Sequence, residues 1–293
     1  MSTSPHISVV IPTHERSELL RCAITSVLAQ TYTDWQMIIV DDAESGSAEV
    51  VASEFHDARI RYVKNDGAHG GAGARNCGIR EARGELVAFL DDDDEWLPEK
   101  LGRQVAVMNN APDDVGFCAT AVLNIFDCRE QETVIEDGVT DFSEIALRRF
   151  KGFLTSTLVV RRHVIEEVGM FDTLFPSHQE AELIIRITRK YKGIGINTPL
   201  VRMNMRSQHT HIGGDMNRRI AGCEMILHKH AELYASRPRL LAQRLYWLGL
   251  WYRDAGRHIK ARGVFGGAWR LHHRLRYLIY WVIASFRGLL STL

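Results

Sequence analysis

The chain has 293 residues, of which 45% are hydrophobic and 25% charged; this is typical of a globular protein and excludes disorder over most of its length. The formal net charge of zero hides a difference between an acidic body and a basic C-terminal region. Five widely spaced cysteines, without a Cys-x-x-Cys pair, argue against a disulfide framework and a structural zinc site and suit a reducing compartment.

Apolar runs and apolar residues at helical spacing alternate along the first part of the chain. Short β-branched runs predict strands at residues 6–12, 35–42, 59–64 and 85–91. Helices are predicted between them, at residues 17–28, 46–55 and 73–82, and Ser17 is expected to cap the first. This alternation predicts a parallel sheet with helices on both faces. From about Met216 onward the pattern is helical.

Polar clusters follow three of these strands, as THER at 13–16, DDAES at 41–45 and DDDDEW at 91–96. Because the carboxyl ends of parallel strands meet at one edge of a sheet, the clusters should lie together where α/β proteins bind ligands. Aspartates two positions apart, such as Asp91 and Asp93, can converge on a Mg²⁺ or Mn²⁺ ion, with a nucleotide diphosphate supplying further oxygens. The alternative is a helix N-terminus, where the macrodipole favours acids and Pro98 would lie near the first turn.

Two further features at this edge leave alternatives open. Asp41 and Asp42 can accept hydrogen bonds from a base or from ribose hydroxyls, or they can form a plain turn. The segment HGGAGARNCG, at 69–78, lacks the G-x-G-x-x-G spacing of a dinucleotide fingerprint. Its glycines predict a tight entry into a helix, with Arg75 directed to the sheet edge and an anionic ligand, or else a structural arginine.

Four segments carry a resemblance to a known family, namely ISVVIPTHER, QTYTDWQMIIVDDAE, GGAGARNCGI and GELVAFLDDDDEWLPEKL. In this order and spacing they resemble the family 2 glycosyltransferases, closely over residues 6–101 and weakly to residue 210. The resemblance implies an α/β fold of GT-A type, a mostly parallel sheet flanked by helices, with a helical C-terminal extension. It implies a catalytic domain at 1–215, with a nucleotide-binding half at 1–110 and an acceptor half at 111–215, and a helical basic and aromatic region at 216–293.

The resemblance also implies which residues hold the donor. The nucleotide would be bound at the ends of three strands and by one helix residue, namely Pro12, Thr13, Glu15, Asp41, Arg75, Asp91 and Asp92. The family's D-x-D motif matches Asp91 to Asp93, so these two would hold Mn²⁺ or Mg²⁺, with Asp93 as the principal ligand. His209, on a polar loop shared with His211, would add to the metal and diphosphate site. His14 and Glu15 depart from the aromatic residue and asparagine that usually follow this threonine.

The catalytic base in similar enzymes is a carboxylate at the start of a helix, six residues before an arginine. Glu180 lies six residues before Arg186 in SHQEAELIIRI, and Gln179 replaces the usual first acid. Glu180 would take a proton from an acceptor hydroxyl as that oxygen attacks the anomeric carbon, and a single displacement would invert the configuration. The alternative is an ordinary acidic residue at a helix N-terminus.

The C-terminal residues 237–293 contain 11 Lys and Arg, one acidic residue and four tryptophans. The apolar run from Tyr277 to Phe286 is too short to span a bilayer, and basic helices with aromatic faces commonly lie in the membrane interface. We therefore expect a cytoplasmic protein, without a signal peptide, that associates peripherally with the inner face of the cell membrane. The alternative is packing on the catalytic domain or on a second copy in a homo-oligomer; nucleic acid would leave the aspartates unexplained.

Together these patterns predict an inverting, metal-dependent hexosyl- or N-acetylhexosaminyl-transferase. Its donor would be a nucleotide-sugar, with UDP expected as the commonest carrier in similar enzymes, and its acceptor a hydroxyl of a lipid-linked or surface polysaccharide glycan. A catalytically inactive, membrane-associated subunit that binds nucleotide or glycan is the alternative, because Gln179 departs from the family pattern. A nucleotidyltransferase is disfavoured, because PTHERSELL lacks the glycine-rich loop that binds a triphosphate.

Overall fold

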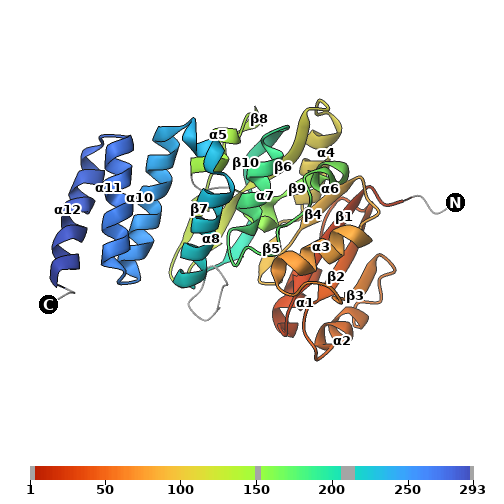
Figure 1. Cartoon of the computed structure of the whole chain (residues 1–293). Helices are drawn as coiled ribbons and strands as arrows, with labels where there is room; N and C mark the ends of the chain where they lie inside the picture. The colour runs from red at the N-terminus through yellow and green to blue at the C-terminus, as the bar shows by residue number, and fades with distance from the viewer. Residues whose placement is uncertain (1–3, 149–152, 206–214, 291–293) are drawn as a thin grey trace. The chain divides into compact units, whose positions relative to one another are not determined.

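The computed structural model describes residues 4–148, 153–205 and 215–290 and divides into two compact units (Figure 1). Unit 1 consists of Met1–Phe142, Phe150–Thr173 and Glu180–His209. Unit 2 consists of Ser143–Arg149, Leu174–Gln179 and Thr210–Leu293. Two short segments from the first 215 residues therefore belong to unit 2, and the division into functional halves stays a prediction.

Unit 1 is built on one large sheet with the strand order β3-β2-β1-β4-β9-β6-β10-β5, in which β7 pairs with β6 and β8 with β10. The strands of the described residues are β1 (Ile7–Thr13), β2 (Trp35–Asp41), β3 (Ile60–Lys64), β4 (Leu86–Phe89), β5 (Asp94–Trp96), β6 (Val115–Ile125), β7 (Glu130–Thr133), β8 (Gly138–Thr140), β9 (Val159–Arg161) and β10 (Lys192–Asn204). Strands β3, β2, β1 and β4 are parallel, as predicted, and β9 pairs antiparallel with β4 and β6. The register places Thr13 beside Asp41, so two of the predicted polar clusters are neighbours.

Helices cover both faces of this sheet, and β1 is therefore buried along its whole length. The helices are α1 (Ser17–Leu28), α2 (Ser47–Ser53), α3 (Gly71–Glu81), α4 (Lys100–Asn109), α6 (Arg162–Glu167) and α7 (Gln179–Ile187), whose first residue lies in unit 2. Ile7, Val9 and Ile11 point to one face and join a core with residues of α1, α2 and α4. Val10 points to the other face, where a Cβ added at Gly78 of α3 would fall 2.3 Å from Val10 Cγ1. The expected fold class is confirmed.

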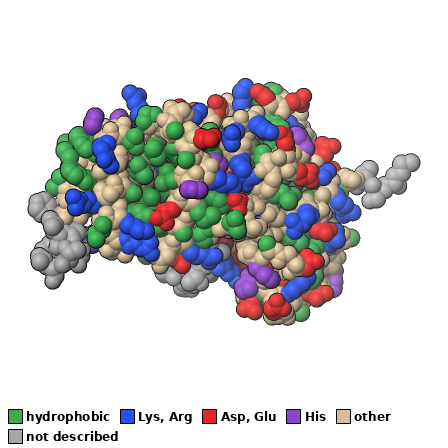
Figure 2. All heavy atoms as spheres, in the orientation of Figure 1, with side chains coloured by type: hydrophobic (Ala, Val, Ile, Leu, Met, Phe, Trp, Pro, Cys, Tyr) green, Lys and Arg blue, Asp and Glu red, His purple; other side chains and the backbone are tan. Residues whose placement is uncertain are grey.

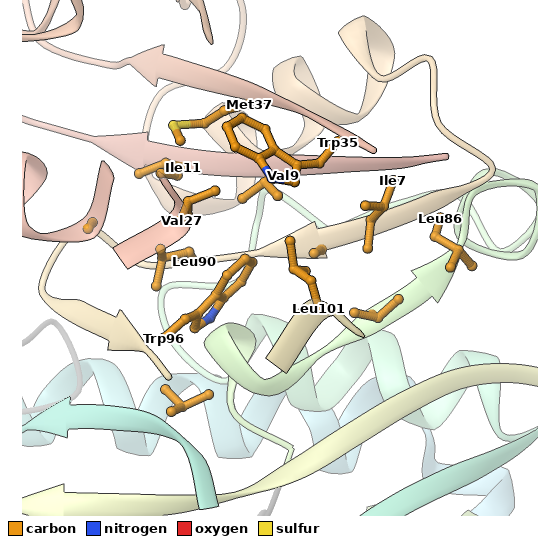
Figure 3. Close-up of a cluster of buried hydrophobic side chains, with 14 of the residues drawn as sticks. Ile7, Val9, Ile11, Val27, Trp35, Met37, Leu86, Leu90, Trp96 and Leu101 are labelled. Carbon is orange, nitrogen blue, oxygen red and sulfur yellow. The ribbon is translucent and has the colours of Figure 1, made fainter. Parts of the chain in front are cut away.

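The core of unit 1 extends to the end of β4, and Figure 3 shows Leu90, Trp96 and Leu101 pointing into it with residues of β1 and β2. Each buried side chain of this size contributes about 1.5–3 kcal/mol of transfer free energy. Leu90 and Trp96 flank the four consecutive aspartates, so the segment that carries them is anchored at both ends. One detail of the prediction was wrong: Arg16, not Ser17, occupies the cap position of α1, and no side chain caps that end. The Arg16 side chain instead turns to the aspartates.

Unit 2 is helical, and the predicted helical C-terminal region is confirmed. Its helices are α5 (Ser143–Arg148), α8 (Met216–Lys229), α9 (Ala231–Ala235), α10 (Pro238–Asp254), α11 (His258–Leu271) and α12 (Leu275–Leu290). The last three share a core in which Tyr246 packs on the rings of Phe265 and Tyr277. Among the described helices, none combines the length and the apolar character needed to cross a bilayer.

Candidate active site

The four aspartates, Asp91 to Asp94, form a turn that leads from β4 into the short strand β5; we call this segment the aspartate turn. The backbone N–H of Asp94 donates to the Asp91 carbonyl oxygen over 3.1 Å, which closes the turn. The next helix, α4, begins only at Lys100, so the alternative explanation of these acids as a helix N-terminus is wrong. Where a helical turn was the alternative, the residues Asp94–Trp96 form strand β5, which pairs antiparallel with β10.

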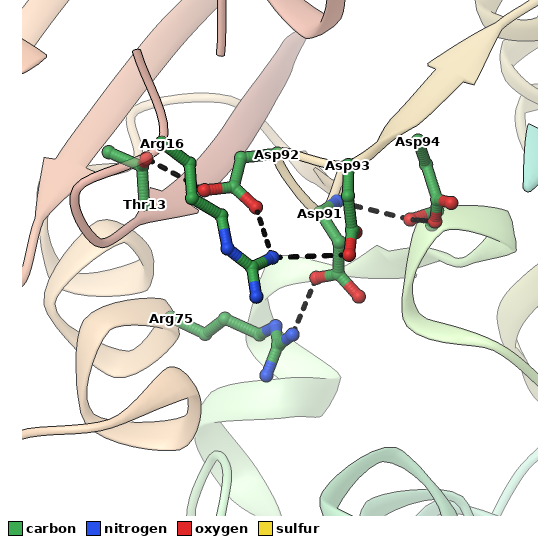
Figure 4. Close-up of polar contacts among 8 residues, drawn as sticks. Thr13, Arg16, Arg75, Asp91, Asp92, Asp93 and Asp94 are labelled. Carbon is green, nitrogen blue, oxygen red and sulfur yellow. Dashed lines mark hydrogen bonds and ion pairs between the residues drawn. The ribbon is translucent and has the colours of Figure 1, made fainter. Parts of the chain in front are cut away.

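Each carboxylate of the aspartate turn has its own partner within unit 1 (Figure 4). Arg75 of α3 binds Asp91 over 2.5 Å, and Arg16 binds Asp92 and Asp93 over 3.2 and 3.1 Å. Two hydroxyls complete the set: Thr13 at the end of β1 donates to Asp92 over 2.8 Å, and Ser156 donates to Asp94 over 2.6 Å. Among the described residues, the partners of these four acids therefore include two guanidinium groups.

Two of these acids have raised pKa values. Burial raises the pKa of Asp92 to about 6, with Asp93 and Asp91 adding to the shift and Thr13 and Arg16 opposing it. Burial, with the repulsion of Asp93 and Asp91, raises the pKa of Asp94 well above its ordinary range. Asp94 is 2% exposed. A cation at this turn would lower both pKa values.

A buried oxygen without a hydrogen-bond partner also favours a cation at the aspartate turn. Oδ1 of Asp94 is buried and has no hydrogen-bond partner among the described residues. Carboxylate oxygens are the ligands that hard cations such as Mg²⁺ and Mn²⁺ take, usually with water and substrate phosphates completing the shell. The described residues do not include three His, Cys, Asp or Glu gathered closely enough to hold a metal by themselves. The aspartate turn thus fits a cation that draws some of its ligands from a substrate.

Glu180, the expected base, is the second residue of α7 and belongs to the same electrostatic neighbourhood. Burial raises the pKa of its carboxyl, with Asp91 adding to the effect, while its own backbone N–H and Arg75 lower it. The Arg75 guanidinium is buried, which lowers its pKa, but Asp91, Glu180 and Asp93 raise it more. Glu180, Arg75 and Asp91 therefore lie within electrostatic range of one another, although Arg75 and Glu180 are more than a hundred residues apart in the chain.

Arg75 reaches this position through the glycine-rich entry to α3, and the predicted tight entry is confirmed. Gly70 adopts a φ of 88°, in the left-handed region that favours glycine. A Cβ at Gly73 would fall 1.6 Å from the Ala68 carbonyl oxygen, so the loop can lie against the helix only because residue 73 is glycine. The side chain of Arg75 is thereby held at the sheet edge, beside Asp91.

The two aspartates at the end of β2, Asp41 and Asp42, bind protein groups. The side chain of Asp41 is fully buried and accepts from Ala43 N over 3.0 Å and Tyr62 Oη over 3.1 Å. Burial and this carboxylate raise the pKa of Tyr62 to about 12. Asp42 accepts from Gly70 N over 2.7 Å, which ties the end of β2 to the entry of α3. The contact of Asp41 with a nucleotide stays a prediction, and the part of Asp42 in building the site was missed.

The remaining predicted residues differ in how they are placed. Pro12 and Thr13 are buried at the end of β1, and Thr13 contacts Asp92. Glu15 is exposed, with a φ of 55° that residues other than glycine rarely adopt. His209 and its neighbour His211 lie outside the described residues. Sequence reasoning missed Arg16, although it belongs to the quoted THER, and Ser156, for which no local pattern gives a signal.

Comparison with known proteins places this geometry in a family. The model for Glycosyl transferase family 2 matches residues 8–161, a stretch that runs from the second residue of β1 to the end of β9 and includes the aspartate turn. The chain belongs to glycosyl transferase family 2. The resemblance drawn from the four sequence motifs is confirmed.

Two relatives illustrate how far the similarity extends. The amylovoran biosynthesis glycosyltransferase AmsB of Erwinia amylovora is 34% identical over 218 residues, which are 68% of this chain and 69% of AmsB. WfgD of Escherichia coli, a UDP-Glc:alpha-D-GlcNAc-diphosphoundecaprenol beta-1,3-glucosyltransferase, is 38% identical over 102 residues, or 35% of this chain. The chain spans about 40% of the length of WfgD.

Solved structures show the same fold at low identity. The S. aureus TarS fragment 1-349 in complex with UDP superposes with a TM-score of 0.66 at 14% identity, over 91% of this chain and 80% of the fragment. The mannosyltransferase PcManGT from Pyrobaculum calidifontis, in complex with GDP-Man and Mn²⁺, gives 0.56 at 18% identity, over 98% and 86% of the two chains. At these identities the likeness concerns the fold alone.

Proposed function

We propose that this chain is an inverting, metal-dependent glycosyltransferase that moves a hexose or an N-acetylhexosamine from a UDP-sugar to a hydroxyl of a lipid-linked or surface polysaccharide glycan. The observation that carries the proposal is the ion pair of Arg75 with Asp91 just after β4, with Glu180 of α7 within electrostatic range of both, in a chain of this family. It combines a carboxylate of raised pKa, a buried cation and an acidic turn, as sugar transfer from a nucleotide requires.

The nucleotide diphosphate would be held by residues at one edge of the sheet, namely Pro12, Thr13, Glu15, Asp41, Arg75, Asp91 and Asp92. Asp91 and Asp93 would hold Mn²⁺ or Mg²⁺, with His209 as a further ligand. The bound cation would neutralise charge on the departing diphosphate. The unsatisfied Oδ1 of Asp94 and the raised pKa values of the turn support a cation there.

The transfer would proceed in one displacement. Glu180 takes the proton of the acceptor hydroxyl, and its raised pKa makes the carboxylate a stronger base. The acceptor oxygen forms a bond to the anomeric carbon as the bond from that carbon to the diphosphate oxygen breaks. The electron pair leaves with the nucleoside diphosphate, and Arg75 can stabilise its charge. Attack opposite the leaving group inverts the anomeric configuration.

The names of the relatives support the substrate classes. WfgD is named for a UDP-glucose donor and an acceptor on diphosphoundecaprenol, AmsB for the biosynthesis of a polysaccharide, and the TarS fragment was solved with UDP. We extend the same classes to this chain, with a position at the inner face of the cell membrane mediated by residues 216–293. The competing proposal is an inactive, membrane-associated subunit that only binds nucleotide or glycan, which Gln179 in place of an acid favours.

The deciding experiment measures UDP release from UDP-glucose and UDP-N-acetylglucosamine, with Mn²⁺, by wild type and by Glu180→Gln. We expect the substitution to lower the rate by at least about 100-fold while UDP binding is kept. Glu166→Gln, on α6 and in an exposed ion pair, is the matched control and should keep the rate. If the wild type binds UDP but releases none from any donor, the inactive subunit is correct instead.

The metal is tested by calorimetric titration of UDP and GDP, with and without Mn²⁺, into wild type and Asp93→Asn. Metal-dependent binding of UDP that the substitution abolishes is the expected result. Equal binding with and without Mn²⁺ would remove the metal from the proposal. Tighter binding of GDP than of UDP would mean that the donor carries guanine instead of uracil. An absence of binding by any nucleotide would contradict the enzymatic proposal as a whole.

A further inference from the structure

Helix α12 is apolar on two opposite sides, and only one of them is covered. Tyr277 and Ala284 are buried in the core of unit 2. On the other side, four aliphatic side chains are 40–68% exposed: Leu275, Ile279, Val282 and Ile283. Their spacing of four, three and one residues places them in a single line, which we call the outer stripe. An aliphatic stripe of this length on a helix is normally covered, so the outer stripe marks a surface for a partner.

Helix α11, which packs on α12, adds exposed positive charge. A groove of about 470 Å³ is lined by α11 and by Trp281 of α12, through Ile259, Arg262, Gly263, Gly266, Trp269 and Arg270. A Cβ at Gly263 would meet no atom within 4 Å, so the groove is open at this point. Arg262 and Arg270 are exposed, and within the described residues neither forms an ion pair. We call the groove and the outer stripe together the α11–α12 face.

The charge of this region has one sign only. Residues 255–293 contain seven Lys and Arg and no Asp or Glu. In Figure 2 hydrophobic side chains gather at the left of the view, over α11 and α12, with Lys and Arg among them. Apolar side chains and tryptophans interspersed with exposed arginines match an anionic lipid surface, which offers acyl chains and phosphate groups side by side.

We propose that the α11–α12 face docks on a bilayer of anionic lipid, with the outer stripe among the acyl chains and a headgroup phosphate in the groove between Arg262 and Arg270. Helix α12 lies in the plane of the interface, because its inner side is packed against the other helices of unit 2 and only the outer stripe can enter the lipid. The inference deepens the proposed function by naming the surface that meets the membrane, and rests on it only for the lipid-linked acceptor.

Two other occupants fit the observations less well. A second copy joined by a twofold axis would bring the exposed Arg262 and Arg270 of one copy against the same basic surface of the other. Nucleic acid would satisfy the cations but would leave the aliphatic outer stripe in water. A lipid surface is the partner that uses both the charge and the apolar side chains.

The test is co-sedimentation of the full chain with vesicles of phosphatidylcholine alone and with about 30% phosphatidylglycerol. Wild type should sediment with the anionic vesicles and far less with the neutral ones. Ile279→Ser with Ile283→Ser, and separately Arg262→Ala with Arg270→Ala, should each weaken the binding on the order of tenfold. Matched controls in unit 1 are Val50→Ser, at an exposed aliphatic residue of α2, and Arg189→Ala, at an exposed arginine.

Each other outcome overturns the inference. Wild type that ignores anionic vesicles, or stripe variants that bind like wild type, would show that the α11–α12 face has another use. A dimer seen by light scattering without lipid, and dissolved by the isoleucine substitutions, would assign the outer stripe to a second copy. UDP release from a soluble donor separates the two proposals, because it should be unchanged in the stripe variants, and its absence in a vesicle-binding wild type would contradict only the catalytic one.

Discussion

The aspartate turn of unit 1 and the α11–α12 face of unit 2 both concentrate charge of one sign, but they treat it differently. The carboxylates of Asp92 and Asp94 are buried, so the fold supplies hydrogen bonds from one arginine and two hydroxyls. Burial raises the pKa values of both carboxylates, and the neighbouring acids add to the shift. The cations of the α11–α12 face are exposed, where water compensates them at little cost in free energy. Buried charge must be balanced within the fold, whereas exposed charge is solvated and remains available to a partner.

The largest expected effect is a pH dependence of the free energy of unfolding, which the buried carboxylates produce and the exposed arginines do not. The pKa of Asp92 is about 6 in the folded protein against an ordinary 3.8, so the folded state binds this proton more tightly than the unfolded chain. The free energy of unfolding should therefore fall as the pH rises from about 4 to about 6, on the order of 3 kcal/mol from this group. Asp94 shifts in the same direction.

Urea unfolding at several pH values, on wild type and Asp92→Asn, measures this effect. The difference in unfolding free energy between the two proteins should grow in favour of the variant as the pH rises through this window. Mn²⁺ with UDP should reduce the slope of the wild type, because a bound cation stabilises the charged carboxylates. Parallel curves for the two proteins would mean that Asp92 is not enclosed in solution.

The next effect is the loss of an enclosed cation. Arg16→Met leaves Asp92 and Asp93 without their guanidinium, and we expect unfolding to become easier by about 2–3 kcal/mol, less than for a fully buried pair because Arg16 is partly exposed. Arg21→Met, on α1, is the control and should cost much less, because its partner Glu54 at the end of α2 is far more exposed than Asp92 and Asp93. Equal melting temperatures of the two variants would contradict the distinction between enclosed and open charge.

The smallest effect compares a covered and an open position within unit 2. A Cβ at Gly222 of α8 would fall 2.5 Å from the Ser177 carbonyl oxygen, so Gly222→Ala should destabilise the protein by about 1–3 kcal/mol. Gly263→Ala, on the open side of α11, should instead stabilise it by about 0.5–1 kcal/mol, because alanine favours a helix. Thermal melts decide, and a destabilised Gly263→Ala would mean that something covers the α11–α12 face in solution.

Much of the site was predictable wherever a motif is continuous in the chain. The run from Leu86 to Asp94 combines a buried strand with acids at its end, and the glycines before Arg75 indicate a tight entry into α3. The partners of those acids were harder to predict. Ser156 reaches Asp94 across 62 residues, and no pattern near Ser156 distinguishes it from any other serine.

By itself the sequence determined the alternation of strands and helices, the polar clusters at the strand ends and the basic character of the last helices, because these depend on neighbours a few residues apart. Only the tertiary structure decided which cation balances which carboxylate, that Glu180 joins Arg75 and Asp91, and which side of α12 stays uncovered. Such contacts depend on the order of strands in the sheet and on the packing of helices, which bring together residues far apart in the chain.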